Sequence, residues 1–187
     1  MFERLETAIP DVILIKPRVY RDARGFFLES YHAEKFAEIG IRDSFMQDNQ
    51  SLSHKGTLRG LHYQWRRPQA KLCRVLRGEV LDVAVDIRRG SPTFGKSISA
   101  VLSAENMHQM YLPAGFAHGF VVLSEEAEFF YKCSDFYDPD GEQGIHWADP
   151  QLAIAWGVND PTVSEKDSRN PRLADVSRER LPIYGPK

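Results

Sequence analysis

The stretch Val80-Leu81-Asp82-Val83-Ala84-Val85-Asp86-Ile87 alternates along its length, and this period of two predicts a β-strand. In an extended chain the odd-numbered aliphatic residues share one face, whereas Asp82, Ala84 and Asp86 share the other. The run ends in Arg88-Arg89-Gly90-Ser91-Pro92, whose glycine and proline are typical of a turn. A single strand is not stable alone, so we expect further strands on both sides of it in the sequence.

Other segments of the chain carry similar strand signals, with residues typical of turns between them. They are 60–64, 71–77, 98–102, 116–123 and 128–133. Helical periodicity is nearly absent between them, so parallel βαβ units are not expected. One helix is predicted at 31–39, with Ser30 as its N-cap and Gly40 just after its end, and a short helical turn is predicted near Ser164. The pattern indicates a β-sandwich or β-barrel.

Composition excludes several classes of protein. The chain has 187 residues, with 24 Lys and Arg against 26 Asp and Glu, so it has no basic excess for non-specific nucleic-acid binding. The longest uncharged stretch, 106–124, contains a proline, two glycines and two histidines, and it indicates a buried sheet segment and no membrane span. The N-terminus lacks the features of a secretory signal, and Cys73 and Cys133 lack C-x-x-C spacing. We expect a cytoplasmic, reduced protein.

Two of the six histidines, His62 and His118, lie in predicted strands beside aromatic and small residues. A histidine on an apolar strand face is more often a hydrogen-bonded core residue than a functional one. Near neutral pH it can also act as a general base, especially when a carboxylate orients its ring. A third alternative is that both histidines ligate a metal ion.

The metal alternative can be weighed from the residues around the two histidines. The segment Pro113-Ala114-Gly115-Phe116-Ala117-His118 has the P-x-G-x-x-H pattern of the second cupin motif. The first cupin motif normally supplies H-x-H and a downstream glutamate, but here Gln64 follows His62 and no glutamate has the expected spacing. Zinc or non-haem iron needs about three protein ligands, so we expect a cupin-like barrel without a metal.

Three more residues, in or next to the predicted strands, could take part in a reaction that moves protons. Tyr131 shares a strand face with Phe129 and Cys133, and its phenol could donate a proton, although a core tyrosine with a satisfied hydroxyl is more common. Lys71 and Arg59 could stabilise an anionic oxygen, although lone basic residues usually lie on a solvated face. The residues by themselves leave these alternatives open.

Short motifs along nearly the whole chain point to one family. In order they are Arg24-Gly25-Phe26-Phe27-Leu28-Glu29, Gln47-Asp48-Asn49, Leu58-Arg59-Gly60-Leu61-His62-Tyr63-Gln64, Gly78-Glu79-Val80, Pro92-Thr93-Phe94-Gly95, Pro113-Ala114-Gly115-Phe116-Ala117-His118-Gly119-Phe120 and Ser164-Glu165-Lys166-Asp167. The chain resembles the dTDP-4-dehydrorhamnose 3,5-epimerase family, the cofactor-free cupins of dTDP-L-rhamnose synthesis. The resemblance implies a mainly β cupin jelly-roll (double-stranded β-helix) barrel with a few short flanking helices. It also implies one domain over residues 1–187, with an N-terminal strand segment and a C-terminal tail of helix and loop.

The resemblance also implies a reaction without cofactor or metal. The family substrate is a dTDP sugar with a ketone at carbon 4, and the enzyme inverts carbons 3 and 5 through an enolate. His62 matches the family base and Asp167 the carboxylate paired with it. Tyr131 matches the acid on the opposite face, and Lys71 would stabilise the enolate oxygen.

Substrate binding is implied in the same way. The resemblance assigns Arg24 and Arg59 to the diphosphate, which suits the forked hydrogen bonds of arginine. The other residues that match binding positions are Glu29, Gln47 and Asn49 around thymine and deoxyribose, Phe27 and Tyr137 as aromatic faces for the base, and His118, Glu142 and Lys166. Family members are homodimers, so some nucleotide contacts are expected to cross the interface from the N-terminal segment.

Two local features do not follow simply from the family pattern. The segment Trp65-Arg66-Arg67-Pro68-Gln69-Ala70 is more basic than the family leads us to expect. Strict alternation also places Arg59 and His62 on opposite strand faces, although both should line one cavity. Either a bulge near Gly60 or a strand that begins only after it would bring them together.

Three rival functions are compatible with the sequence. A relative that acts only at carbon 3 or only at carbon 5, in another deoxysugar pathway, could keep the same histidine and aspartate. A metal-dependent cupin, such as an oxygenase or a sugar-phosphate isomerase, is disfavoured by the missing ligands. A non-catalytic sugar-nucleotide binding or storage module would keep ligand affinity but exchange no protons.

Overall fold

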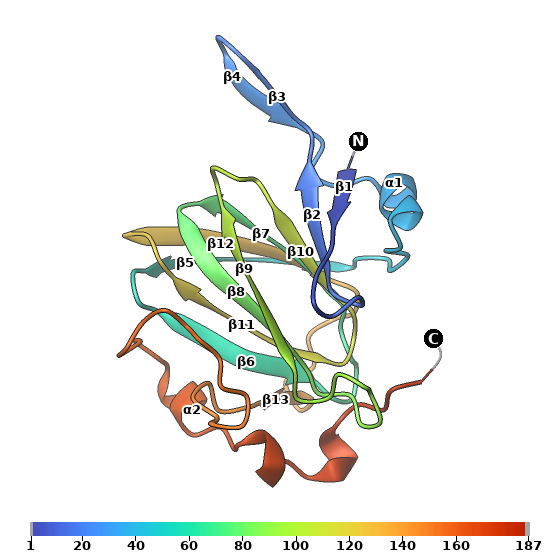
Figure 1. The fold of residues 1–187 in the computed structure, drawn as a ribbon, viewed down its shortest axis with the longest axis vertical. Coiled ribbons are helices and arrows are strands. Elements are labelled where there is room, and N and C mark those ends of the chain that lie inside the picture. The colour runs from blue at the N-terminus through green and yellow to red at the C-terminus, as the bar shows by residue number, and fades with distance from the viewer. Residues whose placement is uncertain (1, 186–187) are drawn as a thin grey trace.

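Two antiparallel β-sheets face one another in a computed structural model that describes residues 2–185 (Figure 1). The first is six-stranded, in the order β1 (Phe2–Leu5), β2 (Ile13–Pro17), β10 (Gln109–Leu112), β7 (Lys71–Arg77), β12 (Glu126–Cys133) and β5 (Gln47–His54). The second is five-stranded, in the order β13 (Glu142–Gly144), β6 (Leu58–Gln64), β11 (Phe116–Val122), β8 (Glu79–Asp86) and β9 (Ser97–Ser103). This arrangement is the mainly β jelly-roll that the family resemblance implies, and it agrees with the sandwich or barrel that the strand pattern indicates.

Short elements surround the two sheets. A hairpin of β3 (Val19–Asp22) and β4 (Gly25–Leu28) extends away from them (Figure 1). The helices are α1 (Ala33–Glu38), α2 (Glu165–Ser168) and the 3-10 turns Leu173–Asp175 and Arg178–Arg180. Within residues 2–185, no helix is long and apolar enough to cross a membrane.

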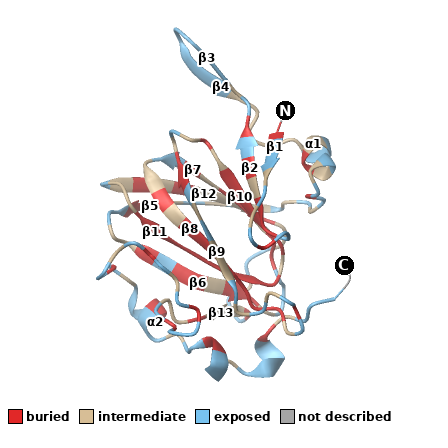
Figure 2. Ribbon diagram, viewed as in Figure 1, coloured by how far each residue is buried: buried red, intermediate tan, exposed pale blue. Residues whose placement is uncertain are grey.

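Strand β8, between β11 and β9, is largely buried on both of its faces (Figure 2). Val83 and Val85 lie in an apolar cluster that the C-terminal segment covers, with Leu173 and Leu181 among its members. The opposite face turns into the space between the two sheets, and Asp82 on that face is completely buried. The alternation in the sequence therefore separates two buried environments, and it brings a carboxylate into the interior of the barrel.

The predicted helix at 31–39 is shorter than expected. It spans Ala33–Glu38, and His32 rather than Ser30 occupies the N-cap position, without a side-chain capping bond. Ser30 instead accepts a hydrogen bond at its carbonyl from Gln109 Nε2, 2.9 Å away, which holds the preceding segment against β10. Gly40, with φ +100°, follows the helix as expected. The helical turn predicted near Ser164 is confirmed as α2, and Ser164 caps it by accepting a hydrogen bond from the backbone N–H of Asp167.

Candidate active site

His62 on β6 and Asp167 on α2 form a hydrogen-bonded pair, with 2.6 Å between Nε2 and Oδ1. Ser164 caps α2 and thereby fixes Asp167, while the backbone N–H of Gly60 donates to its second oxygen at 3.3 Å. Burial by itself would raise the pKa of Asp167, but the hydrogen bonds from His62, Gly60 and Ser164 outweigh it and lower the pKa. Asp167 is therefore ionised, and it favours the tautomer that leaves Nδ1 of His62 as the free lone pair.

A β-bulge brings Arg59 and His62 to the same cavity. On β11, His118 pairs with His62 and Phe120 pairs with Arg59, so β6 contains one more residue than β11 over this interval. Gly60 lies in the bulge with φ +129°, a conformation that glycine adopts without strain. Of the two alternatives that the sequence left open, the structure has the bulge, because β6 already begins at Leu58, before Gly60.

His118 forms a second pair with a buried carboxylate. Its Nε2 lies 2.7 Å from Oδ1 of Asp82 and 3.7 Å from Sγ of Cys73. Burial, opposed by the charge of Asp82, lowers the pKa of His118, which is therefore neutral at neutral pH. The sequence analysis did not assign Asp82 or Cys73 to the site, although an aspartate inside an otherwise apolar strand was a usable signal.

The ligand atoms of Cys73, Asp82 and His118 all lie within 4.8 Å of one another. Within residues 2–185, these three side chains are the group that could in principle hold a metal ion. Thiolate, carboxylate and imidazole suit Zn²⁺. However, His118 and Asp82 already bond to each other, and burial raises the pKa of the Cys73 thiol well above its ordinary value. The metal-free site remains a prediction.

Tyr131 and Lys71 lie close together on neighbouring strands. The ammonium of Lys71 is 5.7 Å from the centre of the Tyr131 ring. Burial, reinforced by the nearby Cys133, Cys73 and Glu142, raises the pKa of Tyr131 well above its ordinary value. The phenol is therefore a neutral proton donor, and a cation stands beside it.

Two adjoining cavities, of about 560 and about 350 Å³, share His62, Lys71, Tyr131 and Asn49 in their walls. All of the predicted site residues other than Arg24, Phe27 and Glu29 line one or both of these cavities. The outer part is a polar network in which the Tyr137 hydroxyl and Lys166 both bond to Glu142. The space and its polar walls suit an elongated, anionic ligand.

The three remaining predicted residues lie elsewhere. Arg24 pairs with Asp22 in the β3–β4 hairpin, and its side chain is 90% exposed. Phe27 and Glu29 line a separate small cavity beside Lys35, which binds Glu29 at 2.6 Å. The hairpin projects away from the sheets, so within one chain these residues do not meet His62 (Figure 1).

The basic loop before Lys71 is fastened to the loop that carries Tyr137. Arg67 binds the Asp135 carboxylate through two of its nitrogens, and its guanidinium lies 5.7 Å from the centre of the Phe136 ring. Gln69 donates to the carbonyl of Asp135 at 2.7 Å. Arg66 also lies 3.8 Å from the carboxylate of Asp140, so both arginines of this segment face a negative charge on the opposite loop.

Residues 6–175 match the model of a single protein family, described as dTDP-4-dehydrorhamnose 3,5-epimerase. This chain belongs to that family. The predicted family and the enzyme class, an epimerase, are thereby confirmed, and the motifs from Arg24 to Asp167 that carried the resemblance all fall inside the matched range.

Individual relatives of this epimerase extend the comparison. A dTDP-4-dehydrorhamnose 3,5-epimerase of Pseudomonas aeruginosa is 59% identical over 171 residues, which are 90% of this chain and 94% of the relative. A crystal structure of dTDP-6-deoxy-D-glucose-3,5-epimerase from Legionella pneumophila, in complex with dTDP-4-keto-L-rhamnose, matches with a TM-score of 0.97 and 50% identity and covers 100% of both chains. A dTDP-4-dehydrorhamnose 3-epimerase of Streptomyces niveus is 42% identical over 173 residues, covering 91% of this chain and 84% of the relative.

Proposed function

We propose that this epimerase inverts carbons 3 and 5 of dTDP-4-dehydro-6-deoxy-D-glucose and so forms dTDP-4-dehydro-L-rhamnose, without a metal or another cofactor. The observation that carries the proposal is the His62–Asp167 pair, which lies in one cavity with Tyr131 and Lys71. The product-class ligand in the Legionella pneumophila relative supports the choice of substrate.

The reaction uses the acidity that the carbon 4 ketone gives to the neighbouring C–H bonds. Nδ1 of His62 accepts the proton, and the electron pair of the broken bond moves into an enolate whose negative oxygen Lys71 stabilises. Tyr131 then donates its proton to the same carbon from the opposite face, and the enolate electron pair forms the new C–H bond. Exchange with water resets His62 and Tyr131, so no oxidant or reductant is needed.

The nucleotide part of the substrate occupies the outer cavity and the region of Arg59. Arg59 binds the diphosphate, and Tyr137 supplies an aromatic face for the base. The residues that complete the contacts to thymine, deoxyribose and sugar are Gln47, Asn49, His118, Glu142 and Lys166.

The active form of the enzyme is a homodimer in which the β3–β4 hairpin reaches the partner's cavity. Three aromatic residues of this hairpin, Tyr20, Phe26 and Phe27, are all at least half exposed. Such a group of exposed apolar side chains is unusual in a monomer and is typical of an interaction site. Arg24 and Phe27 then bind the nucleotide of the partner, together with Glu29.

Turnover of the purified protein in D₂O, followed by NMR and mass spectrometry of the sugar, tests the proposal. We expect one deuterium at carbon 3 and one at carbon 5 of the product. Deuterium at a single carbon would instead assign a mono-epimerase, like the Streptomyces niveus relative. Binding of the sugar nucleotide without any exchange would assign a binding module, and stoichiometric metal with activity lost on chelation would assign a metal-dependent cupin.

A further inference from the structure

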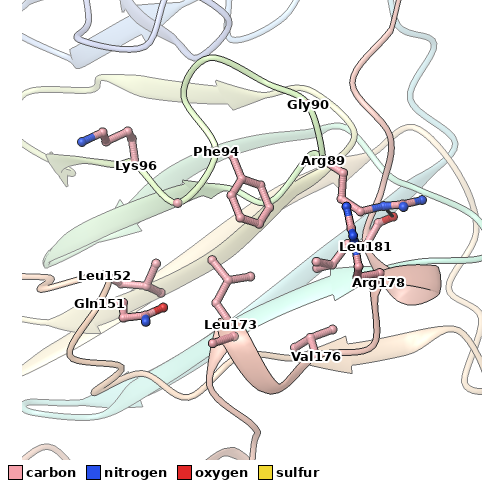
Figure 3. Close-up of a pocket in the computed structure, with 12 residues that line it drawn as sticks. Arg89, Gly90, Phe94, Lys96, Gln151, Leu152, Leu173, Val176, Arg178 and Leu181 are labelled. Carbon is pink, nitrogen blue, oxygen red and sulfur yellow. Dashed lines mark hydrogen bonds between the residues drawn. The ribbon is translucent and has the colours of Figure 1, made fainter.

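A cavity of about 660 Å³ lies outside the active site, between the loop that joins β8 to β9 and the C-terminal segment (Figure 3). It shares no lining residue with the two cavities around His62. The reaction proposed above makes no use of this cavity. None of the residues assigned to catalysis or to nucleotide binding lines it.

The floor of this cavity is apolar. Leu152, Leu173 and Leu181 form it and are each only 6% exposed, while the ring of Phe94 stands over it and is 40% exposed. Phe94, Leu152 and Leu173 point toward one space in Figure 3. A flat apolar group placed there would cover the Phe94 ring and remove its exposed surface from water, which favours binding.

The rim carries positive charge without matching negative charge. Arg89, Lys96 and Arg178 line the cavity, whereas no aspartate or glutamate does so among the described residues. Within the described residues, the side chain of Arg89 forms a single hydrogen bond, in which Nε donates to the carbonyl of Leu181 at 3.4 Å. Within residues 2–185, the side chains of Lys96 and Arg178 have no hydrogen bond or ion pair, so each keeps its donors for a ligand.

One carboxylate behind the floor, that of Asp149, is held by backbone hydrogen bonds. Both oxygens of Asp149 accept backbone N–H groups, from Gln151 at 2.9 Å and from Leu173 at 2.7 Å. Asp149 thus holds the backbone of the floor in place and, within residues 2–185, forms no ion pair with the basic residues of the rim. The neighbouring Arg88 does not line the cavity, and its Nε and Nη2 bond to the buried carboxylate of Asp86.

The two walls are held together before any ligand arrives. The backbone N–H of Arg89 donates to the carbonyl of Pro182 at 2.8 Å, and the N–H of Tyr184 donates to the carbonyl of Arg89 at 2.9 Å. A site whose walls are already fixed loses little conformational entropy when it binds a ligand.

We propose that this cavity binds a small organic anion in which a phosphate, sulfonate or carboxylate group is joined to an aromatic ring. The anionic group lies at the rim between Arg89 and Arg178, where guanidinium groups form charge-assisted hydrogen bonds. The ring lies on the apolar floor and stacks on Phe94. Charge and apolar surface are thus both complementary to one ligand.

Phenyl phosphate is the probe for the experiment, in an NMR titration of the ¹⁵N-labelled protein with dTDP present to occupy the active site. We expect the amides of Gly90 and Gly95 in the cavity wall to shift, while those of Asn49 and Arg59 do not. Inorganic phosphate should bind more weakly, and phenol more weakly still, because each lacks one half of the ligand.

Variants test which residues bind the anionic group of the probe and which bind its ring. The double substitution Arg89→Ala with Arg178→Ala should weaken phenyl phosphate binding about tenfold or more, since two charged hydrogen-bond donors are lost. Phe94→Ala should weaken phenyl phosphate but leave inorganic phosphate unchanged. Arg172→Ala, an exposed arginine outside the cavity, is the matched control and should have no effect. Unshifted Gly90 and Gly95 amides at millimolar probe, or equal affinity in the double variant, would overturn the proposal.

Discussion

Gly60 and Gly119 touch across neighbouring strands so closely that a β-carbon on Gly60 would lie 2.5 Å from the α-carbon of Gly119. The contact sits at the bulge of β6, one residue beyond Arg59 and two before His62. The close approach therefore sets the direction of two side chains that the proposed reaction needs.

Gly60→Ala should destabilise the protein by about 3 kcal/mol or more, because the new methyl group meets backbone that cannot move aside. Urea unfolding measures the change, and epimerase activity should fall with it. Gly56→Ala is the control, since Gly56 also has positive φ, +76°, but has nothing within 4 Å of the added carbon. We expect it to cost only about 1 kcal/mol. Equal losses in both variants would mean that backbone conformation, and not the contact, matters at Gly60.

His62→Ala and Tyr131→Phe should separate the two halves of the reaction. Without the His62 base, solvent exchange at both carbons should stop, while dTDP still binds with nearly unchanged affinity. Without the Tyr131 hydroxyl, proton removal should continue but inversion should be impaired, so deuterium enters with retained configuration. Deuterium incorporation by NMR, together with calorimetric titration of dTDP, gives both readouts. Full exchange in the His62 variant would assign the base to another residue.

The buried His118 should make stability depend on pH. Its pKa in the folded protein lies below the ordinary value of 6.5, because burial disfavours the imidazolium. Between these two values the unfolded chain binds more protons, so this contribution to stability is complete above pH 6.5 and is lost as the pH falls toward the folded pKa. Urea unfolding at a series of pH values, from pH 7.5 to about one unit below the ordinary histidine pKa, measures how steeply stability depends on pH.

The matched variant for this pH series is His118→Asn, which keeps a donor for Asp82 but does not titrate. The slope of stability against pH should be smaller in the variant than in the unmodified protein. Identical slopes would assign the pH dependence to other groups, of which His108, also with a lowered pKa, is the first to consider.

Mixed dimers test whether the hairpin serves the partner's cavity. One chain carries His62→Ala, and the other carries Arg24→Ala with Phe27→Ala; each is expected to be nearly inactive alone. Co-expression in equal amounts makes half of the dimers mixed, and each mixed dimer has one cavity with both an intact base and an intact hairpin. Activity should therefore return to about a quarter of that of the unmodified enzyme. No recovery at all would mean that each hairpin serves its own chain.

Much of this site could be predicted because its residues lie in motifs with clear strand periodicity. The predicted strands 71–77 and 116–123 nearly coincide with β7 and β11, so Lys71 and His118 do lie in strands as predicted. β5, with the sequence Gln-Asp-Asn-Gln-Ser-Leu-Ser-His, was not predicted as a strand, because it is an edge strand whose polar side chains face solvent and the cavity. Its pairing with β12, and not its composition, makes it a strand.

The pairing of His118 with Asp82 could not be read from the sequence. The alternating pattern placed Asp82 on the correct face of β8, but it did not show which residues that face contacts. The face with the two aspartates looks polar in the sequence, yet in the structure Asp82 is buried inside the barrel against His118. Similarly, the hairpin residues were assigned to the site by resemblance, and no local pattern reports that they lie far from His62 in their own chain.

The order in which the chain is synthesised gives the C-terminal segment a further consequence. All strands of both sheets precede α2, so the ribosome completes the barrel before it makes Asp167. The outer face of β8, with Val83 and Val85, also lacks part of its cover until Leu173 and Leu181 have been made. A prematurely terminated chain would therefore hold His62 without its carboxylate and expose an apolar sheet face that cellular proteases and chaperones recognise. The C-terminal segment therefore supplies both the carboxylate that pairs with His62 and part of the apolar cover of β8.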